Sequence, residues 1–325
     1  MRSAFIDSLL ELAQRDDRVM LVVGDLGFGV VTRFAEELPR QFVNAGVAEQ
    51  NMTGLATGMA LNGKIVFTYS IANFPVLRCL EQIRNDVCYH QANVKIVAVG
   101  GGMAYGSLGM SHHATEDIAI MRALPHMVVI APNDPIESAL ATRAVAAHDG
   151  PCYLRLGRAG EQVIHNADLE FQIGKAITVR DGHDVTLLVT GGLLGNVLAV
   201  SDLLRERGVH ARVLSVPTIK PLDEEAVLQA ARETNAIFTI EEHSVIGGLG
   251  GAVSEVLMER SQRPITFKRI GLNSMFASRV GSQDYLRAEY GLDTFGILAT
   301  VSRTLGISAS FNEAAATAEL AAANR

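Results

Sequence analysis

Short runs of β-branched and aliphatic residues alternate along this chain with longer segments of helical spacing, and this alternation limits the possible folds more than any other feature. The runs are predominantly apolar, as in strands that are buried on both faces of a sheet. They lie at residues 19–23, 64–67, 94–99 and 127–132. Parallel strands joined by helices on both faces predict an α/β, doubly wound domain with a mostly parallel sheet.

The pattern stops between residues 166 and 182, where polar and charged residues predominate, and then resumes. The second series has runs rich in β-branched and aliphatic residues at 185–192, 209–216 and 236–242. We therefore expect two doubly wound domains, at 1–170 and 171–307, of which the second is the smaller. The segment 308–325 is rich in alanine and poor in large apolar residues, and we expect it to be a disordered tail.

Composition excludes several classes of protein. The formal charge of −7 comes without a basic run, so neither nucleic acid nor a membrane surface is an expected partner. No apolar run approaches the roughly 20 residues that span a bilayer, and the N-terminal segment has the pattern of an amphipathic helix, not of a signal peptide. Cys79, Cys88 and Cys152 lack metal-ligand spacing, which is typical of reduced thiols in a cytoplasmic protein.

A single acid, Glu49, stands near the start of a run of small and apolar residues at 44–63, NAGVAEQNMTGLATGMALNG. Glycine weakens a helix, so Gly54 and Gly58 indicate close packing against another backbone. Glu49 could simply stabilise the start of this helix through the helix dipole. A carboxylate in such an apolar setting can also share a proton with a weakly basic ring nitrogen. The residues alone leave both interpretations open.

This segment resembles the signature of transketolases, deoxyxylulose-phosphate synthases and the β subunits of 2-oxoacid dehydrogenases, all of which use thiamine diphosphate. The resemblance implies that Glu49 hydrogen-bonds the cofactor's aminopyrimidine and favours its imino tautomer. The segment 67–90, FTYSIANFPVLRCLEQIRNDVCYH, is similar to the part of the family that packs aromatic rings on the pyrimidine. By this resemblance Phe74 is the expected stacking residue, with Tyr69 behind it.

A third segment, 107–134, contains SHHATEDIAIMRALP and resembles the loop and helix in which transketolases place a histidine facing the substrate carbonyl. The resemblance puts His112 at that position and His113 beside it as a further substrate contact. A histidine titrates near neutrality, so it can hydrogen-bond a developing alkoxide or move a proton. This segment favours a transketolase, which transfers a two-carbon ketol unit from a ketose to an aldose.

Three positions depart from the ordinary transketolase pattern. Leu108 stands in place of an aspartate that binds a substrate hydroxyl, Gly100 in place of a phosphate-contacting histidine, and Gly29 in place of a phosphate-site serine. Arg158 remains at a position where relatives bind substrate phosphate, and its planar guanidinium suits two phosphate oxygens. It could equally be a surface arginine at a domain edge. The departures indicate an unusual acceptor sugar and leave open whether the sugar is phosphorylated.

The family signature for diphosphate and magnesium, a GDG followed by an NN pair, has no counterpart here, since GDLG at 24–27 has Leu26 at the third position, where the signature has glycine. Mg²⁺ needs several hard oxygen ligands, so no metal ligand is expected on this chain. We expect thiamine diphosphate at an interface, with its pyrimidine on this chain and its diphosphate and Mg²⁺ on a partner. That partner would be the N-terminal subunit of a split transketolase, in an α2β2 heterotetramer.

Two alternatives remain open. The chain could be the β subunit of a 2-oxoacid dehydrogenase or part of a split deoxyxylulose-type synthase, where Glu49 and His112 would look much the same. It could also be a non-catalytic assembly subunit, although an inactive copy has no reason to keep a costly acid in an apolar setting. The glycine-rich turn in 241–255 lacks the spacing of a dinucleotide fingerprint and resembles a structural turn of the family's second domain.

Overall fold

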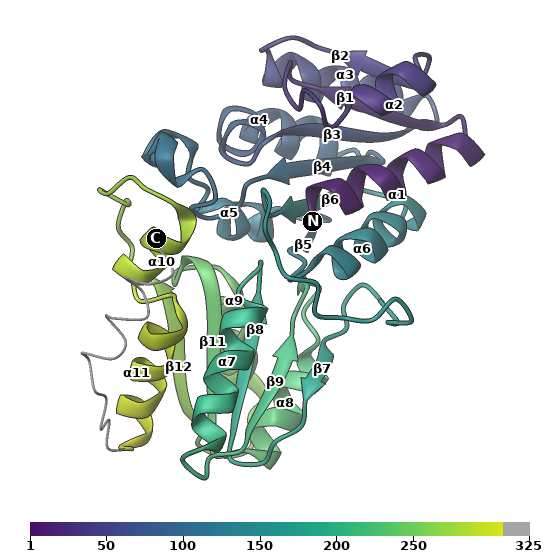
Figure 1. Ribbon diagram of the computed structural model, residues 1–325. Coiled ribbons are helices and arrows are strands. Elements are labelled where there is room, and N and C mark those ends of the chain that lie inside the picture. Colours follow the sequence, from purple (N-terminus) through teal and green to yellow (C-terminus); the bar gives the residue numbers. More distant parts are fainter. Residues whose placement is uncertain (308–325) are drawn as a thin grey trace.

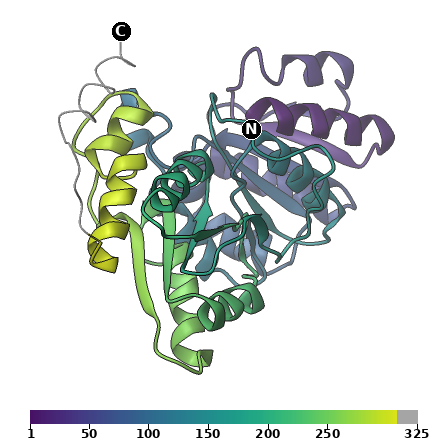
Figure 2. The same cartoon turned by 60° about the horizontal axis from the view of Figure 1, so that its bottom comes forward.

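The computed structural model describes residues 1–307, which form two α/β domains, one above the other in Figure 1. The segment 308–325, for which we expect a disordered tail, lies outside the described residues. In Figure 2 the second domain, green to yellow, is turned forward. Both sheets are mostly parallel with helices on both faces, which confirms the predicted fold class.

The first domain is built on a seven-stranded sheet in the order β10-β5-β6-β4-β3-β1-β2. Its strands are β1 Val19–Val23, β2 Phe42–Asn44, β3 Ile65–Ile71, β4 Val94–Val99, β5 Val128–Ile130, β6 Cys152–Leu156 and the edge strand β10 Thr218–Lys220. Its helices and turns are α1 Arg2–Arg15, α2 Thr32–Glu37, α3 Glu49–Leu61, η1 Phe74–Arg78, α4 Leu80–Gln82, η2 Ile83–Cys88, η3 Gly106–Leu108, η4 Met110–His112, α5 Asp117–Ala123 and α6 Pro135–Ala147. β1, β4 and β6 are buried along their whole length, including Lys95 of β4 and Arg155 of β6, as in strands covered on both faces of a sheet.

Two hydrophobic clusters lie on opposite faces of this sheet. Phe5 of α1, Tyr69 of β3 and Ala141 of α6 belong to one cluster, and Met52 of α3 and Ile118 of α5 belong to the other. Because side chains alternate along a strand, neighbouring residues of β3 contribute to different clusters. The carboxyl ends of β1, β3, β4 and β6 meet at one edge, which is where parallel sheets bind ligands.

The second domain has a five-stranded sheet in the order β12-β11-β8-β9-β7, in which β7 runs antiparallel to β9. Its strands are β7 Ile177–Arg180, β8 Val185–Thr190, β9 Ala211–Ser215, β11 Ala236–Ser244 and β12 Thr266–Leu272. Its helices are α7 Leu194–Arg205, α8 Glu224–Glu233, α9 Leu249–Arg260, α10 Gln283–Glu289 and α11 Thr294–Leu305.

The short strand β10 crosses between the domains. It comes from the C-terminal half of the chain, beyond the expected boundary at 170, yet it pairs antiparallel with β5 in the first sheet. Three residues carry too weak a pattern to be recognised in a sequence. The boundary at 170 stays a prediction, and the structure adds that the first sheet is completed by residues from beyond it.

Candidate active site

Glu49 lies at the N-terminal end of α3 and its side chain is only 3% exposed. Arg78 donates a hydrogen bond from Nη1 to Oε2 of Glu49 at 2.9 Å. The end of β1 packs directly on the acid, because a Cβ added at Gly24 would lie 3.7 Å from Cγ of Glu49 and 3.6 Å from Oγ of Ser70. The carboxylate therefore sits in a small, dry space between β1, β3 and α3.

Ser70 supplies an unused polar atom in the same space. The residue is fully buried, and its Oγ has no hydrogen-bond partner among residues 1–307. Buried hydroxyls are nearly always bonded, so an orphaned one beside a buried carboxylate indicates that a polar group is bound there in the working protein. A flat heterocycle with ring nitrogens and an amino group fits this requirement.

Phe74 and Arg78 come from the π-helical turn η1 that follows β3. The guanidinium carbon of Arg78 lies 4.6 Å from the centre of the Phe74 ring. On another side, the Phe74 ring meets the imidazole of His112 edge to face, with ring centres 5.2 Å apart. The structure thus brings Glu49, Phe74 and His112 together through Arg78, which sequence reasoning missed.

Tyr105 extends this cluster toward Arg158. Its ring centre lies 6.4 Å from that of His112, and the guanidinium of Arg158 lies 5.0 Å from the Tyr105 ring. Burial raises the pKa of the Tyr105 hydroxyl, while the positive charges of Arg2 and Arg158 oppose the rise. Arg2 and Tyr105 are candidate site residues that the sequence did not single out.

Gly100, one of the three positions that depart from the transketolase pattern, has a structural explanation. A Cβ at this position would lie 2.1 Å from Cε2 of Tyr105, so the tyrosine ring fills the space that a side chain at 100 would need. Gly29 faces open space and Leu108 is 53% exposed. At position 100, one of the three that depart from the transketolase pattern, the Tyr105 ring therefore occupies the space of a side chain.

His113 points inward beside His112 and is 4% exposed. Neither ring nitrogen has a hydrogen-bond partner in the described part of the chain. Burial lowers the pKa of His113, and the nearby Gly106 backbone and Glu242 carboxylate oppose the shift only in part. The lowered pKa favours the neutral imidazole, while the substrate contact expected for His113 stays a prediction.

Tyr69 is not brought to Phe74. It points to the opposite face of β3 from Ser70, is 1% exposed, and stacks on Phe5 with ring centres 6.0 Å apart. Burial raises the pKa of its hydroxyl. Tyr69 packs in the cluster under α1, because side chains alternate along β3 and its side chain leaves the strand on that face. This place does not support the prediction that Tyr69 lies behind the ring of Phe74.

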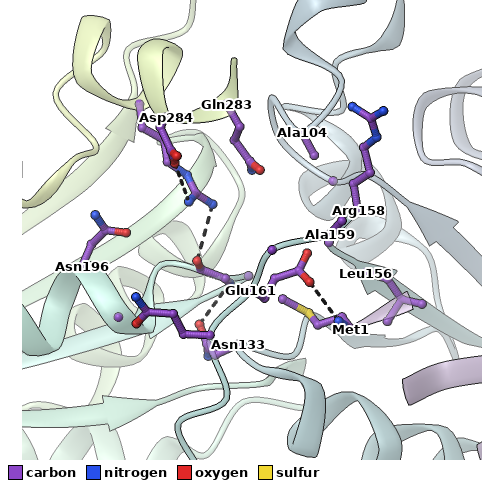
Figure 3. Close-up of a pocket in the computed structure, with 18 of the residues that line it drawn as sticks. Met1, Ala104, Asn133, Leu156, Arg158, Ala159, Glu161, Asn196, Gln283 and Asp284 are labelled. Atoms are coloured by element: carbon purple, nitrogen blue, oxygen red, sulfur yellow. Dashed lines mark hydrogen bonds and ion pairs between the residues drawn. The ribbon is translucent and has the colours of Figure 1, made fainter. Parts of the chain in front are cut away.

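A cleft of about 1000 Å³ opens between the domains beside this cluster (Figure 3). Figure 3 shows Leu156 and Arg158 of the first domain on one side, with Asn196 and Asp284 of the second domain opposite. Arg2 and Arg158 both line this cleft. Two cations in the lining of one cleft suit a substrate with an anionic group.

The described residues also limit other kinds of site. Within 1–307 no group of three or more His, Cys, Asp or Glu side chains could hold a metal ion. Over the same range, none of the helices combines the length and the apolar character required to cross a bilayer.

A two-domain α/β chain that presents a buried carboxylate, an aromatic face and a histidine at the carboxyl edge of a parallel sheet has the features of an enzyme subunit for a flat heterocyclic cofactor. Residues 1–160 match the family model for the transketolase pyrimidine-binding domain, and residues 174–297 match that for the transketolase C-terminal domain. The chain belongs to the transketolase family.

Curated relatives are similar over nearly the whole chain. One subunit of the apulose-4-phosphate transketolase of Phocaeicola vulgatus is 42% identical over 301 residues, covering 92% of this chain and 95% of the relative. The 6-deoxy-6-sulfo-D-fructose transketolase subunit SqwH of a Clostridium species is 41% identical over 293 residues, covering 90% of each. Deoxyxylulose-phosphate synthases, such as one from Geobacter sulfurreducens, are 34% identical and are matched over 47% of their length.

Solved structures agree. A split-gene transketolase, described as an inactive β4 tetramer, superposes with a TM-score of 0.85 at 38% identity, covering 94% of this chain and 98% of that one. The transketolase of Campylobacter jejuni has a TM-score of 0.77 at 18% identity over 92% of this chain and 46% of its own, which shows the shared fold alone. The chain is thus a transketolase subunit and part of a thiamine-diphosphate-dependent transferase, as the sequence predicted.

Proposed function

We propose that this chain forms the pyrimidine half of a shared active site and transfers a two-carbon ketol unit only together with a partner chain that holds the diphosphate and Mg²⁺. The observation that carries the proposal is the buried carboxylate of Glu49 next to the Phe74 ring face, connected through Arg78. The names of the similar transketolases describe each relative as one subunit of its enzyme, which supports a two-chain protein, and we propose an α2β2 assembly for it.

Thiamine diphosphate, when bound, supplies the nucleophilic carbon for the transfer. On this chain Glu49 would hold or move a proton at Oε1 or Oε2, because burial excludes the water that would otherwise compete for it. Phe74 would offer its ring face once Arg78 has moved aside, and the unpaired Ser70 hydroxyl would bond a polar edge. The Glu49 carboxylate, the Ser70 hydroxyl and the Phe74 ring face therefore fit an aminopyrimidine.

His112 is proposed to act at the substrate carbonyl. It is half-buried, its Nδ1 lies 3.0 Å from Oγ of Ser111, and it stands between Phe74 and Tyr105. An imidazole held this way can donate a hydrogen bond to an oxygen that gains negative charge, or return a proton to it. His113 is proposed to contact the substrate beside His112 through an uncharged ring, because burial favours its neutral form.

Arg158 and Arg2 are proposed to bind an anionic end of the sugar. Both line the interdomain cleft, and both lie close enough to Tyr105 to act on its ionisation. The relatives from Phocaeicola and Clostridium act, by their names, on a sugar phosphate and on a sulfonated sugar. We propose that the acceptor or donor of this enzyme likewise has a terminal anionic group, which two guanidinium groups can grip in several geometries.

The partner is proposed to dock on the exposed face of α3. An added Cβ at Gly54 or Gly58 would meet no atom within 4 Å, and Leu55 and Leu61 beside them are 39% and 59% exposed. Glycines that nothing in residues 1–307 packs against weaken the helix without any benefit inside the chain. Close approach of another chain's backbone gives them a role.

The test is reconstitution with the partner chain, thiamine diphosphate and Mg²⁺. We expect turnover of hydroxypyruvate with an aldehyde acceptor, and none of pyruvate with a lipoyl acceptor. The reverse preference would support the 2-oxoacid dehydrogenase alternative. Absence of any turnover from a complex that binds the cofactor would support the non-catalytic alternative.

A further inference from the structure

We infer that Glu242, in the second domain, is a positioning residue for the active-site loop of the first domain. The loop spans 102–114 and carries Tyr105 and His112. The importance of the loop for catalysis rests on the proposed function, whereas the contact itself does not. Through this contact the second domain would control how accurately His112 is placed.

Glu242 lies near the carboxyl end of β11 and is 1% exposed. Its Oε1 accepts a hydrogen bond of 2.6 Å from the backbone N–H of Met103, across the domain boundary. Arg287 donates from Nε to Oε2 at 2.6 Å, and Gln283 donates from Nε2 to both oxygens at 2.9 and 3.0 Å. Arg287 and Gln283 thus fix the carboxylate so that one oxygen points at the loop.

The base of the loop receives further bonds. Gly102 and Ala114 exchange backbone hydrogen bonds of 2.8 and 2.9 Å, which close the loop into a ring. Arg155 then donates from Nη2 to the carbonyl of Ala114 at 2.8 Å and to that of Glu242 at 3.0 Å. Glu242 therefore holds both ends of the loop: Met103 through its side chain, and Ala114 through its carbonyl and Arg155.

Gly101, just before the loop, and Gly102, its first residue, leave room for these contacts. Gly102 has φ +67, and a Cβ there would lie 2.4 Å from Oε1 of Glu242. A Cβ at Gly101 would lie 2.5 Å from Nε of Arg155. Any side chain at these positions would push a charged group away from the backbone. Gly101 and Gly102 therefore have a specific use, which is to let Arg155 and Glu242 reach the backbone of the loop.

The strength of the contact follows from its charge and burial. A hydrogen bond to an ionised carboxylate in a dry setting is about twice as strong as a neutral one. Without it, the loop would still be held by the Gly102 and Ala114 pair, by Arg155 at Ala114, by a 2.6 Å bond from Nδ2 of Asn73 to the carbonyl of Ser111 and by a 3.3 Å bond from Gly281 N to the carbonyl of Gly106. None of these bonds involves the backbone N–H of Met103, which Glu242 alone accepts among the described residues. A shift of about 1 Å in a positioning element can lower catalysis on the order of 100-fold.

The experiment compares Glu242→Ala, Glu242→Gln and Glu241→Ala in the reconstituted two-chain enzyme. Glu241 is a matched control, because it is the adjacent buried glutamate but bonds the N–H groups of Leu249 and Gly250 inside its own domain. Two readouts are taken: kcat and KM for two-carbon transfer, and hydrogen–deuterium exchange of the Met103 amide. The exchange needs no activity, so failure of the proposed function and failure of this inference are distinguishable.

For Glu242→Ala we expect the Met103 amide to exchange about 10-fold to 100-fold faster and kcat/KM to fall by a similar factor. Glu242→Gln keeps an oxygen acceptor and should recover most of both readouts. Glu241→Ala should lower Tm but leave the Met103 exchange and kcat/KM within about threefold. Equal Met103 exchange in Glu242→Ala and Glu241→Ala would overturn the inference. If Glu242→Ala does not assemble, Gln283→Ala is measured instead, and it should accelerate exchange of the Met103 amide by a smaller factor. Unchanged exchange in Gln283→Ala would then also overturn the inference.

Discussion

Arg78 contacts Glu49 and Phe74 at once, with a 2.9 Å hydrogen bond to the carboxylate and its guanidinium 4.6 Å from the ring centre. A flat group with N–H donors thus already occupies the place proposed for the aminopyrimidine. Half of the Arg78 side chain, 52%, is exposed, so it can swing outward without opening the core. Cofactor binding on this face would require that movement.

Replacing Arg78 should therefore make the cofactor bind more tightly. Solvent screens the half-exposed Arg78, so its ion pair with the buried Glu49 should contribute up to about 1 kcal/mol, and removing this competing contact would lower the apparent Kd for thiamine diphosphate by about threefold to fivefold. Titration of the reconstituted Arg78→Ala enzyme measures this. Arg84→Ala is the control, because the Arg84 side chain donates a hydrogen bond to its neighbour Asn85 and not to Glu49. Weaker binding in Arg78→Ala would mean that the arginine also holds the bound cofactor.

Alanine at Gly58 should have opposite effects on the chain and on the assembly. No atom lies within 4 Å of an added Cβ, so the change should stabilise α3 in the isolated chain by about 0.5 to 1 kcal/mol. The same methyl group should weaken association, because it holds the partner's backbone away. Tm of the isolated chain and the dissociation constant of the complex measure the two effects. Unchanged association would place the partner elsewhere.

Gly100 and Tyr105 should behave as a coupled pair. Gly100→Ala adds a methyl group 2.1 Å from the Tyr105 ring, at a backbone φ of +80, and should lower the free energy of unfolding by roughly 1 to 3 kcal/mol. Combined with Tyr105→Ala, the loss should be smaller than the sum of the two single losses, since the added methyl then has room. Denaturant unfolding of the four chains measures the coupling. Strict additivity would show that the ring can move away freely.

The pair of His165 and Glu137 should make stability depend on pH. Burial lowers the pKa of His165, but the hydrogen bond and charge of Glu137, with Asp134, outweigh burial and leave the pKa raised. Nε2 of His165 lies 2.8 Å from Oε1 of Glu137. Because the folded chain favours the charged imidazole, its contribution is complete below about pH 6.5 and is lost as the pH rises through the raised pKa.

The measurement is the free energy of unfolding of wild type and His165→Gln across that pH range. The difference between them should be largest near pH 6 and shrink as the solution becomes alkaline. His183→Gln is the control, because the His183 side chain is 74% exposed. A difference that grows with pH would mean that the folded chain favours the neutral imidazole instead.

The sequence predicted what local patterns determine. The buried strands β1, β4 and β11 fall where apolar runs indicated them, and α3 begins at Glu49. The clustering of Glu49, Phe74 and His112 was anticipated from family resemblance, because these residues stand in distinctive segments. A glycine run before a tyrosine at 100–105 was a further signal, but its meaning needs the ring of Tyr105 in place.

The rest depended on three-dimensional contacts that have no sequence pattern. Arg78 lies in a π-helical turn, whose wider winding shifts side chains away from the usual helical spacing. Arg2 is far in sequence from Arg158 and Asp284, with which it lines the cleft. The family resemblance predicts Tyr69 behind Phe74, whereas strand alternation turns it to the other face of β3, where it stacks on Phe5.

The role proposed for Glu49 is tested most sharply by the rate of two-carbon transfer of Glu49→Gln mixed with the partner chain, cofactor and Mg²⁺. Glutamine keeps the shape and an acceptor for Arg78, so assembly should persist by size-exclusion chromatography. The carboxylate's proton role is lost, and kcat should fall by at least about 100-fold relative to the wild-type mixture. A Glu49→Gln enzyme that turns over at the wild-type rate would show that this carboxylate does not activate the cofactor.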